Sequence, residues 1–270
     1  MRAPLYCLCL LLLVCLVIAE SYYDEERDLQ DRNIYYNTNG DNFQTDYKKL
    51  SDLLVKTHSH RTDYGEARGH LYPTIDRYPD DSLKCVYSQK LLEGDNKAAA
   101  GGVRIMVRGG SNPTYNCEHS MPQSWFNKQL PMKGDIHHLF TAETRCNGFR
   151  GNLPFGHYDT KKGDRALKEM AGCGIMFDRD GVKSFFPLYG RGAVARAVLY
   201  FITRYPGEIE HRNIPESHLE DIKQWAKDYP AERWEQHRNR YIYEVQGNRN
   251  PYIDFPTLVS EIDFSGALSN

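Results

Sequence analysis

An acid, an amide and several histidines are concentrated between Tyr115 and Phe155 of this 270-residue chain. Glu118 offers a hard carboxylate oxygen and Asn147 a neutral amide oxygen, and such ligands, completed by water, suit Mg²⁺ or Ca²⁺. A zinc site would favour several His or Cys ligands. His119 follows the carboxylate and is then free to act as a base, because imidazole takes protons near neutral pH. These residues suit metal-assisted hydrolysis of a phosphodiester.

An arginine and a second amide lie close to this set in the sequence. Asn147 and Arg150 are three residues apart, which places them on one face of a helix. Arg150 could therefore contact the phosphate whose oxygen binds the metal, and the alternative is an ordinary surface arginine. Asn152 comes just after the expected helix, where an amide commonly fixes a turn.

A β-hairpin and a helix are predicted to bring these side chains together. Residues 135–139 alternate polar and apolar, as in the return strand of a hairpin. Thr141 is expected to cap a helix that runs to about Arg150. His137 and His138 would point to opposite faces of a regular strand, so at most one of them can face the site.

The chain contains, in order, the segments CEHSMPQSWF, MKGDIHHLFTAETRCNGFRGNLPFG, GRGAVARAVLYFITRY and QGNRNPYIDFPTLV. From near Tyr47 to near Ile262 it resembles the endonuclease I family of secreted and periplasmic nucleases. The resemblance implies a ββα-metal (His-Me) finger, in which the Glu of a Glu-His pair and a helix Asn hold the metal and the His activates water. Matched by motif, these residues are Glu118, Asn147 and His119.

The resemblance also matches His137 to an Asp-X-His element, as a residue that orients a ligand or touches phosphate. Some family members carry a long insertion before this element, with an arginine that stabilises the transition state. Here the segment from Ser120 to Gly134 is short and contains no arginine. Either Arg150 or Arg145 is expected to take that role, or no residue does.

A secreted metal-dependent endonuclease is the predicted function, with DNA as substrate and RNA as a second candidate. Mg²⁺ is the expected cofactor, with Ca²⁺ or Mn²⁺ as alternatives. The resemblance implies little sequence selectivity. The main alternative is a secreted nucleic-acid-binding or structural module whose catalysis has decayed, and the intact Glu118, His119 and Asn147 argue against it. A secreted zinc protein lacks a recognised ligand spacing.

Residues 1–19 have the pattern of a secretory signal peptide. Arg2 is followed by an apolar run up to Ala19, with small side chains placed for signal peptidase. The run of about 15 apolar residues is shorter than the roughly 20 needed to span a bilayer. The protein is therefore expected to be extracellular or periplasmic and not held in a membrane after cleavage.

Four cysteines remain beyond the signal segment: Cys85, Cys117, Cys146 and Cys173. An even number in an exported chain favours disulfides, and four cysteines allow three pairings. Sequence leaves the pairing open. Cys85 and Cys173 lie near predicted strands, and a link between them is favoured.

Charge divides the chain into an acidic arm and a slightly basic body. Residues 20–44 hold seven acids against two arginines, whereas residues 45–270 hold 31 Lys and Arg against 29 acids. So weak a basic balance does not by itself indicate nucleic-acid binding. The tyrosine-rich arm is expected to be a poorly ordered tail, with a pro-segment or a competitor for substrate as the alternative. A phosphate-binding groove or, more commonly, a solvated helix face would explain Arg233, Arg238, Arg240 and Arg249.

The nuclease-like residues 45–270 predict a single mixed α+β domain in which helices flank the ββα element, because no repeat or linker divides them. Apolar spacing predicts helices at about 45–57, 194–205, 219–229 and 234–245, a hairpin at 175–186 and a strand at 103–107.

Overall fold

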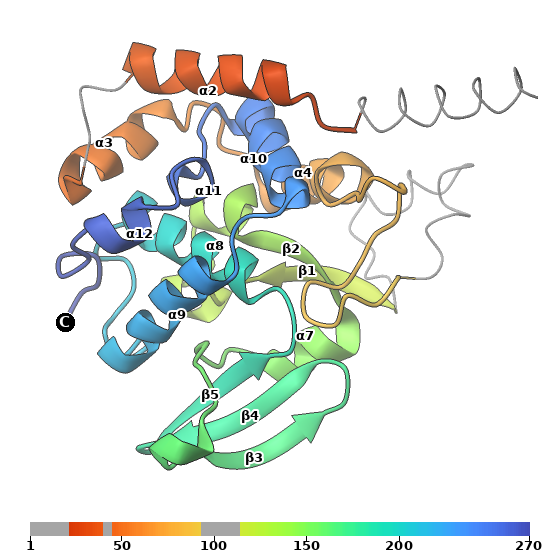
Figure 1. Ribbon diagram of the computed structural model, residues 1–270, viewed down its shortest axis with the longest axis vertical. Helices are drawn as coiled ribbons and strands as arrows, with labels where there is room; N and C mark the ends of the chain where they lie inside the picture. The colour runs from red at the N-terminus through yellow and green to blue at the C-terminus, as the bar shows by residue number, and fades with distance from the viewer. Residues whose placement is uncertain (1–21, 40–44, 93–113) are drawn as a thin grey trace, which may run out of the picture.

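The computed structural model describes residues 22–39, 45–92 and 114–270 (Figure 1). The predicted signal peptide at 1–19 and the predicted strand at 103–107 lie outside the described residues. Within the described ranges, no helix is long and apolar enough to cross a membrane.

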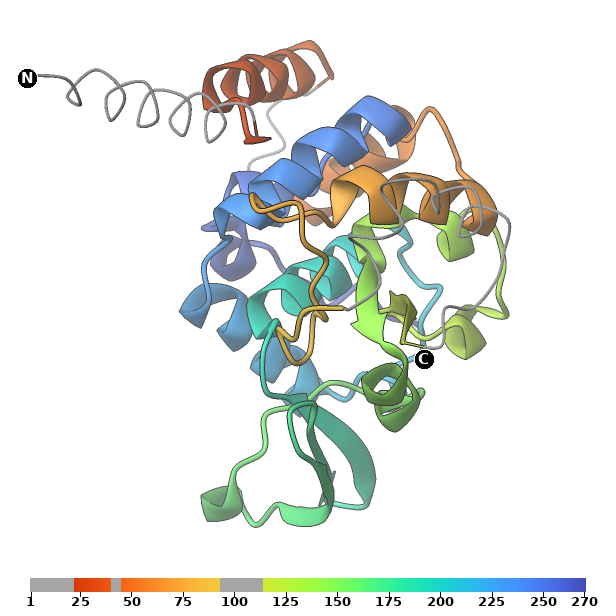
Figure 2. The same cartoon turned by 90° about the vertical axis from the view of Figure 1, so that its right-hand side faces the viewer.

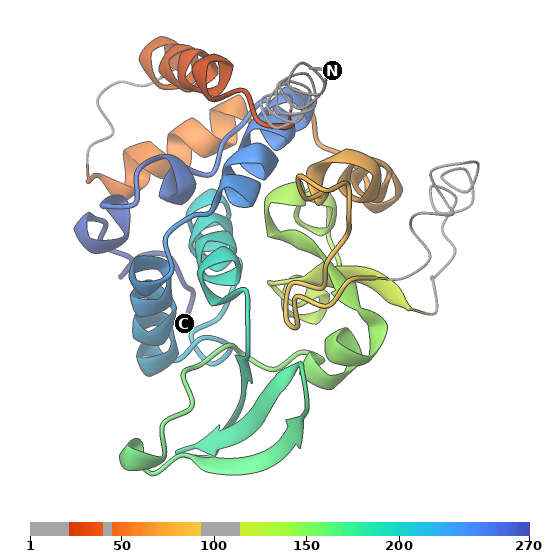
Figure 3. The ribbon, with the colours of Figure 1, turned by 45° about the vertical axis from the view of Figure 1, so that its right-hand side comes forward.

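A short β-hairpin and the helix after it lie beside the central helix of the fold (Figure 3). Strand β1 (Tyr115–His119) pairs antiparallel with β2 (Leu139–Glu143), and Glu118 lies opposite Phe140. Helix α7 (Thr144–Arg150) follows β2 without a loop and packs against β1. The chain therefore contains two paired strands followed by a helix, in the order that was expected, with three 3₁₀ turns between the strands.

The return strand begins later than predicted. Residues 136–138 form a 3₁₀ turn because the side chain of Asp135 accepts a hydrogen bond from the His137 backbone and caps it. Thr141 does not cap a helix, since it lies within β2. Its hydroxyl and its N–H both donate to the buried carboxylate of Asp76, at 2.6 Å each.

Helix α8 (Arg191–Arg204) is the most completely buried helix of the described residues. Every residue from Gly192 to Arg204 is buried, as expected for a helix covered on all sides. Helices α3 (Tyr47–Thr57) and α9 (Glu216–Asp228) pack directly against it. The remaining helices of the body are α4 (Tyr64–His70), α10 (Arg233–Gln246), α11 (Pro251–Asp254) and α12 (Leu258–Glu261).

A second sheet contains β3 (Arg165–Met170), β4 (Gly174–Arg179) and β5 (Val182–Pro187) in antiparallel order. Asp180 and Gly181 both have positive φ, as a two-residue hairpin turn requires, so the predicted hairpin is confirmed. The described residues thus form one α+β domain. Figures 1 and 2 show this sheet at the opposite end of the molecule from helix α2 (Glu25–Asn39).

The acidic arm, 20–44, was expected to be disordered, and this is wrong for α2. Tyr35 is fully buried, and Asp28 accepts hydrogen bonds of 2.8 Å from Tyr23 and from Arg249. The composition of residues 20–44 suggested that they have too few apolar side chains to form an ordered structure. Buried tyrosines and an acid that pairs with a buried arginine supply the missing interactions, and neither effect is visible in the net charge.

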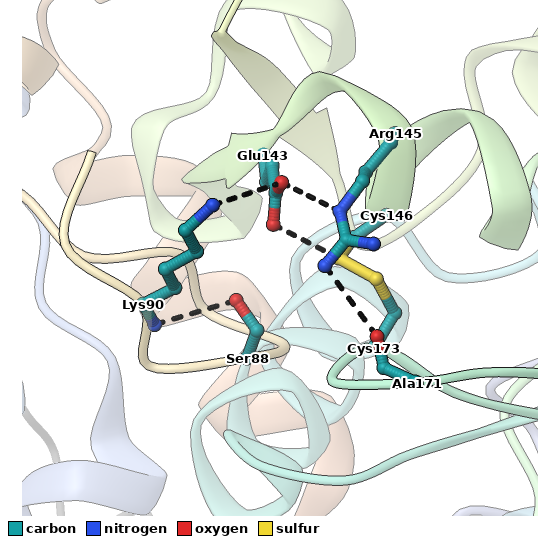
Figure 4. The surroundings of a disulfide bond; sticks show 7 residues. All are labelled: Ser88, Lys90, Glu143, Arg145, Cys146, Ala171 and Cys173. Atoms are coloured by element: carbon teal, nitrogen blue, oxygen red, sulfur yellow. Dashed lines mark hydrogen bonds and ion pairs between the residues drawn. A yellow bond between two sulfur atoms is a disulfide. The ribbon is translucent and has the colours of Figure 1, made fainter. Parts of the chain in front are cut away.

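The favoured pairing of Cys85 with Cys173 is also wrong. Cys146 and Cys173 form a disulfide, with 5.3 Å between their Cα atoms, while Cys85 and Cys117 are free and buried. The segment at Cys85 is held against β2, because the next residue donates its N–H to the carbonyl of Thr141. Cys173 instead lies beside the first turn of α7 (Figure 4).

The contacts of α2 lead to a stability prediction. Asp28→Asn should lower the free energy of unfolding by about 1–3 kcal/mol, because Arg249 loses one of its charged partners and keeps Asp254. Urea titration and limited proteolysis within residues 25–39 would measure the effect. Arg27→Ala on the same helix is the control, since this side chain is 60% exposed and should contribute little. Equal stability of the two variants would contradict the prediction.

The disulfide leads to a second stability prediction. Cys173→Ser should lower the free energy of unfolding by about 3 kcal/mol, because the cysteines are separated by 27 residues and the bond restricts the unfolded chain. In reductant the variant and the wild type should converge. Mass spectrometry of non-reduced peptides should recover Cys146 linked to Cys173, and a peptide linked through Cys85 would refute the pairing.

Candidate active site

Glu118 lies on β1 and is only 1% exposed. Its Oε1 accepts hydrogen bonds from the hydroxyl of Tyr87 at 2.6 Å and from Nη1 of Arg150 at 2.7 Å. Among the described residues, none hydrogen-bonds Oε2. Burial raises the pKa of Glu118 above its usual value, and the charge of Arg150 opposes that shift. One carboxylate oxygen is therefore held in place and the other is available to a ligand.

Tyr87 is a residue of this site that the sequence did not reveal. It is fully buried, and burial raises the pKa of its phenol well above the usual value. A tyrosine in an apolar run needs a hydrogen-bond partner once buried, which was the available signal. That signal does not identify Glu118 as the partner, because the two residues meet only in the folded chain.

Arg150 is not a surface arginine. It is 1% exposed, and besides Glu118 it donates to the carbonyls of His119 and Ser120 at 2.8 and 2.7 Å. Its guanidinium carbon lies 4.4 Å from the ring centroid of Phe155. Arg150 thus joins the side chain of Glu118 to the backbone at the end of β1.

Asn147 lies one turn before Arg150, and both side chains face β1. Its Nδ2 donates to Oδ1 of Asn116 at 2.6 Å and to the carbonyl of Cys117 at 3.3 Å. Asn116 and Glu118 are two apart on a strand, so they share one face. Asn147 therefore contacts the face that carries Glu118, and within the described chain its Oδ1 has no hydrogen-bond partner.

His119 occupies the last position of β1, on the opposite face from Glu118. Its Nε2 lies 3.0 Å from the carbonyl of Lys133, and its Nδ1 lies 3.2 Å from the amide nitrogen of Gln123. The carbonyl requires a proton on Nε2, which leaves Nδ1 as the basic nitrogen. Burial, with the charges of His138 and Lys133, holds the pKa of His119 well below its usual value, so the ring is neutral near pH 7.

His138, not His137, is the histidine beside His119. The rings of His119 and His138 are 5.3 Å apart, centroid to centroid. Nε2 of His137 lies 3.2 Å from the carbonyl of Asn248, and its ring centroid lies 4.3 Å from that of Tyr200. These contacts involve neither Glu118 nor His119. The prediction of opposite faces assumed a strand, whereas the 3₁₀ turn buries both histidines.

The other two predicted residues do not join this cluster. Arg145 donates to Glu143 at 2.6 Å beside the disulfide, with its side chain half exposed (Figure 4). Asn152 is exposed in the turn after α7. Across the described ranges, the set of three His, Cys, Asp or Glu ligand atoms found close together is Glu143, Cys146 and Cys173. Because those sulfurs are bonded to each other, no thiolate is available for a metal there.

Comparison with known proteins identifies the family. The sequence model of endonuclease I matches residues 43–257. The chain belongs to the endonuclease I family. Relatives of this family member include a periplasmic deoxyribonuclease of Aeromonas hydrophila, 36% identical over 131 residues, which are 48% of this chain and 49% of that protein.

Two Bacillus relatives align over longer segments. An extracellular ribonuclease of Bacillus amyloliquefaciens is 31% identical over 247 residues, or 78% of this chain and 81% of that protein. An extracellular ribonuclease of Bacillus subtilis strain 168 is 31% identical over 174 residues, or 58% and 56%. Against the Aeromonas hydrophila deoxyribonuclease, the chain spans about half of the relative's length.

The buried histidines predict a pH dependence of stability. Burial lowers the pKa of both His137 and His138 from 6.5 to about 4. Between these values the unfolded state binds protons that the native state does not, so stability should rise with pH, by about 1.4 kcal/mol per pH unit for each histidine. His138→Leu should reduce that slope by about 1.4 kcal/mol per pH unit, the contribution of one proton, in urea titrations between pH 4 and 6.5.

Phe126→Leu is the matched control for this experiment. Phe126 packs on the ring of His138 but carries no titratable group, so the variant should be less stable with an unchanged slope. A His138→Leu slope equal to that of the wild type would show that this histidine does not titrate as its burial requires.

Proposed function

We propose that the chain is a secreted, divalent-metal-dependent endonuclease that hydrolyses phosphodiester bonds of DNA, with RNA as a second substrate. The observation that carries the proposal is the buried Glu118, which has one oxygen fixed by Tyr87 and Arg150 and the other without a hydrogen-bond partner among the described residues, on the strand face that Asn147 contacts through Asn116. The family supports a nuclease, since relatives are named as deoxyribonucleases and ribonucleases.

An extracellular or periplasmic location is part of this proposal. The relatives are named as periplasmic or extracellular proteins, and a disulfide between Cys146 and Cys173 is typical of an oxidising compartment.

The residues present fit a hard divalent ion. Oε2 of Glu118 and Oδ1 of Asn147 are oxygen donors of the kind that Mg²⁺ uses, with water completing its shell. A buried carboxylate with a raised pKa and one unbonded oxygen is costly without a cation beyond Arg150. When bound, the ion would supply charge neutralisation at the phosphate and the leaving oxygen.

His119 would act as the general base. Its Nδ1 accepts a proton from water, and the water oxygen attacks phosphorus in line as the bond to the leaving oxygen breaks. The amide of Gln123 occupies the place at Nδ1 that this water needs, so it has to move aside. The carbonyl of Lys133 keeps the other nitrogen protonated and stabilises the imidazolium that forms. An entering phosphodiester anion raises the proton affinity of the ring.

Replacing Asn147, Glu118 or His119 should reduce nuclease activity in three different ways. Asn147→Ala removes a neutral ligand, so part of its activity should return at higher Mg²⁺ concentration. Glu118→Gln should be rescued less, because the anionic ligand is gone. His119→Ala should bind the metal nearly normally yet turn over 10² to 10⁴ times more slowly, roughly the usual scale for a lost base. Plasmid nicking and RNA digestion across a Mg²⁺ titration, with EDTA as the blank, would measure these rates.

A matched control for His119 is His60→Ala. His60 is exposed and paired with Glu66, so this variant should retain wild-type rates. Full recovery of His119→Ala by excess Mg²⁺ would mean that the histidine is a ligand. Nucleic-acid binding without cleavage under any divalent ion would support a non-catalytic binding module instead.

A further inference from the structure

Among the described residues, the two arginines predicted for the site are not free to meet a phosphate. Arg150 is buried against Glu118, and Arg145 is paired with Glu143. The segment from Ser120 to Gly134, which follows β1, contains no arginine. Two cations do pack on the ring of Tyr64, which contacts His119: Arg68 on α4 and Lys133, a lysine of this same segment.

Arg68 and Lys133 flank a single aromatic ring, that of Tyr64. The guanidinium carbon of Arg68 lies 4.4 Å from the ring centroid, and Nζ of Lys133 lies 5.4 Å from it. The same ring lies 5.1 Å from the ring of His119. Tyr64, Arg68 and Lys133 are each partly exposed, so both cations reach solvent while they pack on the ring that contacts the catalytic histidine.

Neither cation has an acidic partner among residues 22–39, 45–92 and 114–270. Nε of Arg68 donates to the carbonyl of Tyr64, 3.3 Å away in its own helix, and this leaves the outer N–H groups of the guanidinium unused. A ring beneath a cation holds it in place without neutralising its charge.

A tight contact holds together the two backbone segments that carry these cations. The hydroxyl of Thr62, just before α4, donates to the carbonyl of Gly134 at 2.7 Å. The backbone of Thr62 leaves no room for a Cβ at Gly134, so only glycine fits there. Helix α4 and the loop carrying Lys133 are therefore held together as one surface.

We propose that Arg68 and Lys133 form a binding site for a backbone phosphate of the nucleic acid, with Tyr64 as the platform between them. The inference rests on the proposed function, which supplies the phosphodiester. Arg68 presents a planar fork that can hold two phosphate oxygens, and Lys133 adds a point charge. The site holds the strand so that the scissile phosphate lies at His119.

Nucleic-acid binding in EDTA tests this site without requiring cleavage. The full-length protein is titrated against a short fluorescent DNA duplex and an RNA strand at several salt concentrations, and anisotropy is measured. Arg68→Ala and Lys133→Ala should each raise Kd by about 10-fold and reduce the salt slope by about one. Arg68→Lys should retain the slope and lose part of the affinity. In Mg²⁺, kcat/KM of the alanine variants should fall by a similar factor.

Arg191→Ala is the matched control. Arg191 is also partly exposed, lies 4.5 Å from the ring of Tyr229, and has no acidic partner in the described part of the chain, but its contacts are remote from His119. Its Kd and slope should equal those of the wild type. Thermal melting checks folding, and if Arg68→Ala unfolds, Arg68→Lys and Lys133→Ala decide the result.

Unchanged Kd and salt slope in the folded variants would overturn the site, as would an equal loss in Arg191→Ala. A wild-type protein that binds nucleic acid but cleaves none would refute the proposed hydrolysis. The phosphate site would then be decided by the Kd values and salt slopes of the variants alone. A wild-type protein that neither binds nor cleaves would refute both.

Discussion

The site depends on the buried ion pair between Arg150 and Glu118, whose side chains are 1% and 2% exposed. Removing two charges from water costs several kcal/mol for each ion, and attraction offsets this only when the remaining polar atoms are well bonded. Here Tyr87 and the carbonyls of His119 and Ser120 provide those bonds. The pair thereby joins β1, α7 and the segment around Tyr87, and it fixes the direction of one carboxylate.

A second buried acid positions the base. Asp135 is fully buried, and its Oδ2 accepts hydrogen bonds of 2.9 Å from Tyr200 of α8 and from Tyr205, the residue that follows this helix. Burial opposes its ionisation, but the charges of nearby histidines, His58 first, hold the pKa of Asp135 below its usual value. The loop that ends at this residue presents the Lys133 carbonyl to His119. The tautomer of His119 therefore depends on helix α8, which anchors Asp135, as well as on the hairpin that carries His119.

Local pattern was enough to predict the hairpin of β4 and β5, the main helices and the shared face of Asn147 and Arg150, because each follows from strand alternation or helical spacing. The grouping of Glu118 with Asn147 rested instead on ligand chemistry and on the resemblance to the family. Tyr87 was missed because its contact with Glu118 arises only when distant segments meet. His137 was preferred to His138 by its match to the Asp-X-His element, whereas His138 is the one whose ring lies beside that of His119. The arm was misjudged for a related reason: its composition predicts disorder, but one acid, Asp28, finds a buried arginine. Cysteine pairing likewise depends on which loop meets α7, and spacing does not determine that.

The arginines show why net charge is a poor guide to this surface. Arg249 is buried between Asp28 and Asp254, Arg238 pairs with Asp76, and Arg196 with Glu235. Such residues neutralise acids inside the fold and offer nothing to a polyanion. The excess of two cations in residues 45–270 therefore says little about where phosphate can bind. What matters is the position of cations that have no acidic partner in the described part of the chain. Two of these pack on the Tyr64 ring beside His119, so a weakly charged body is compatible with a local attraction for a phosphodiester.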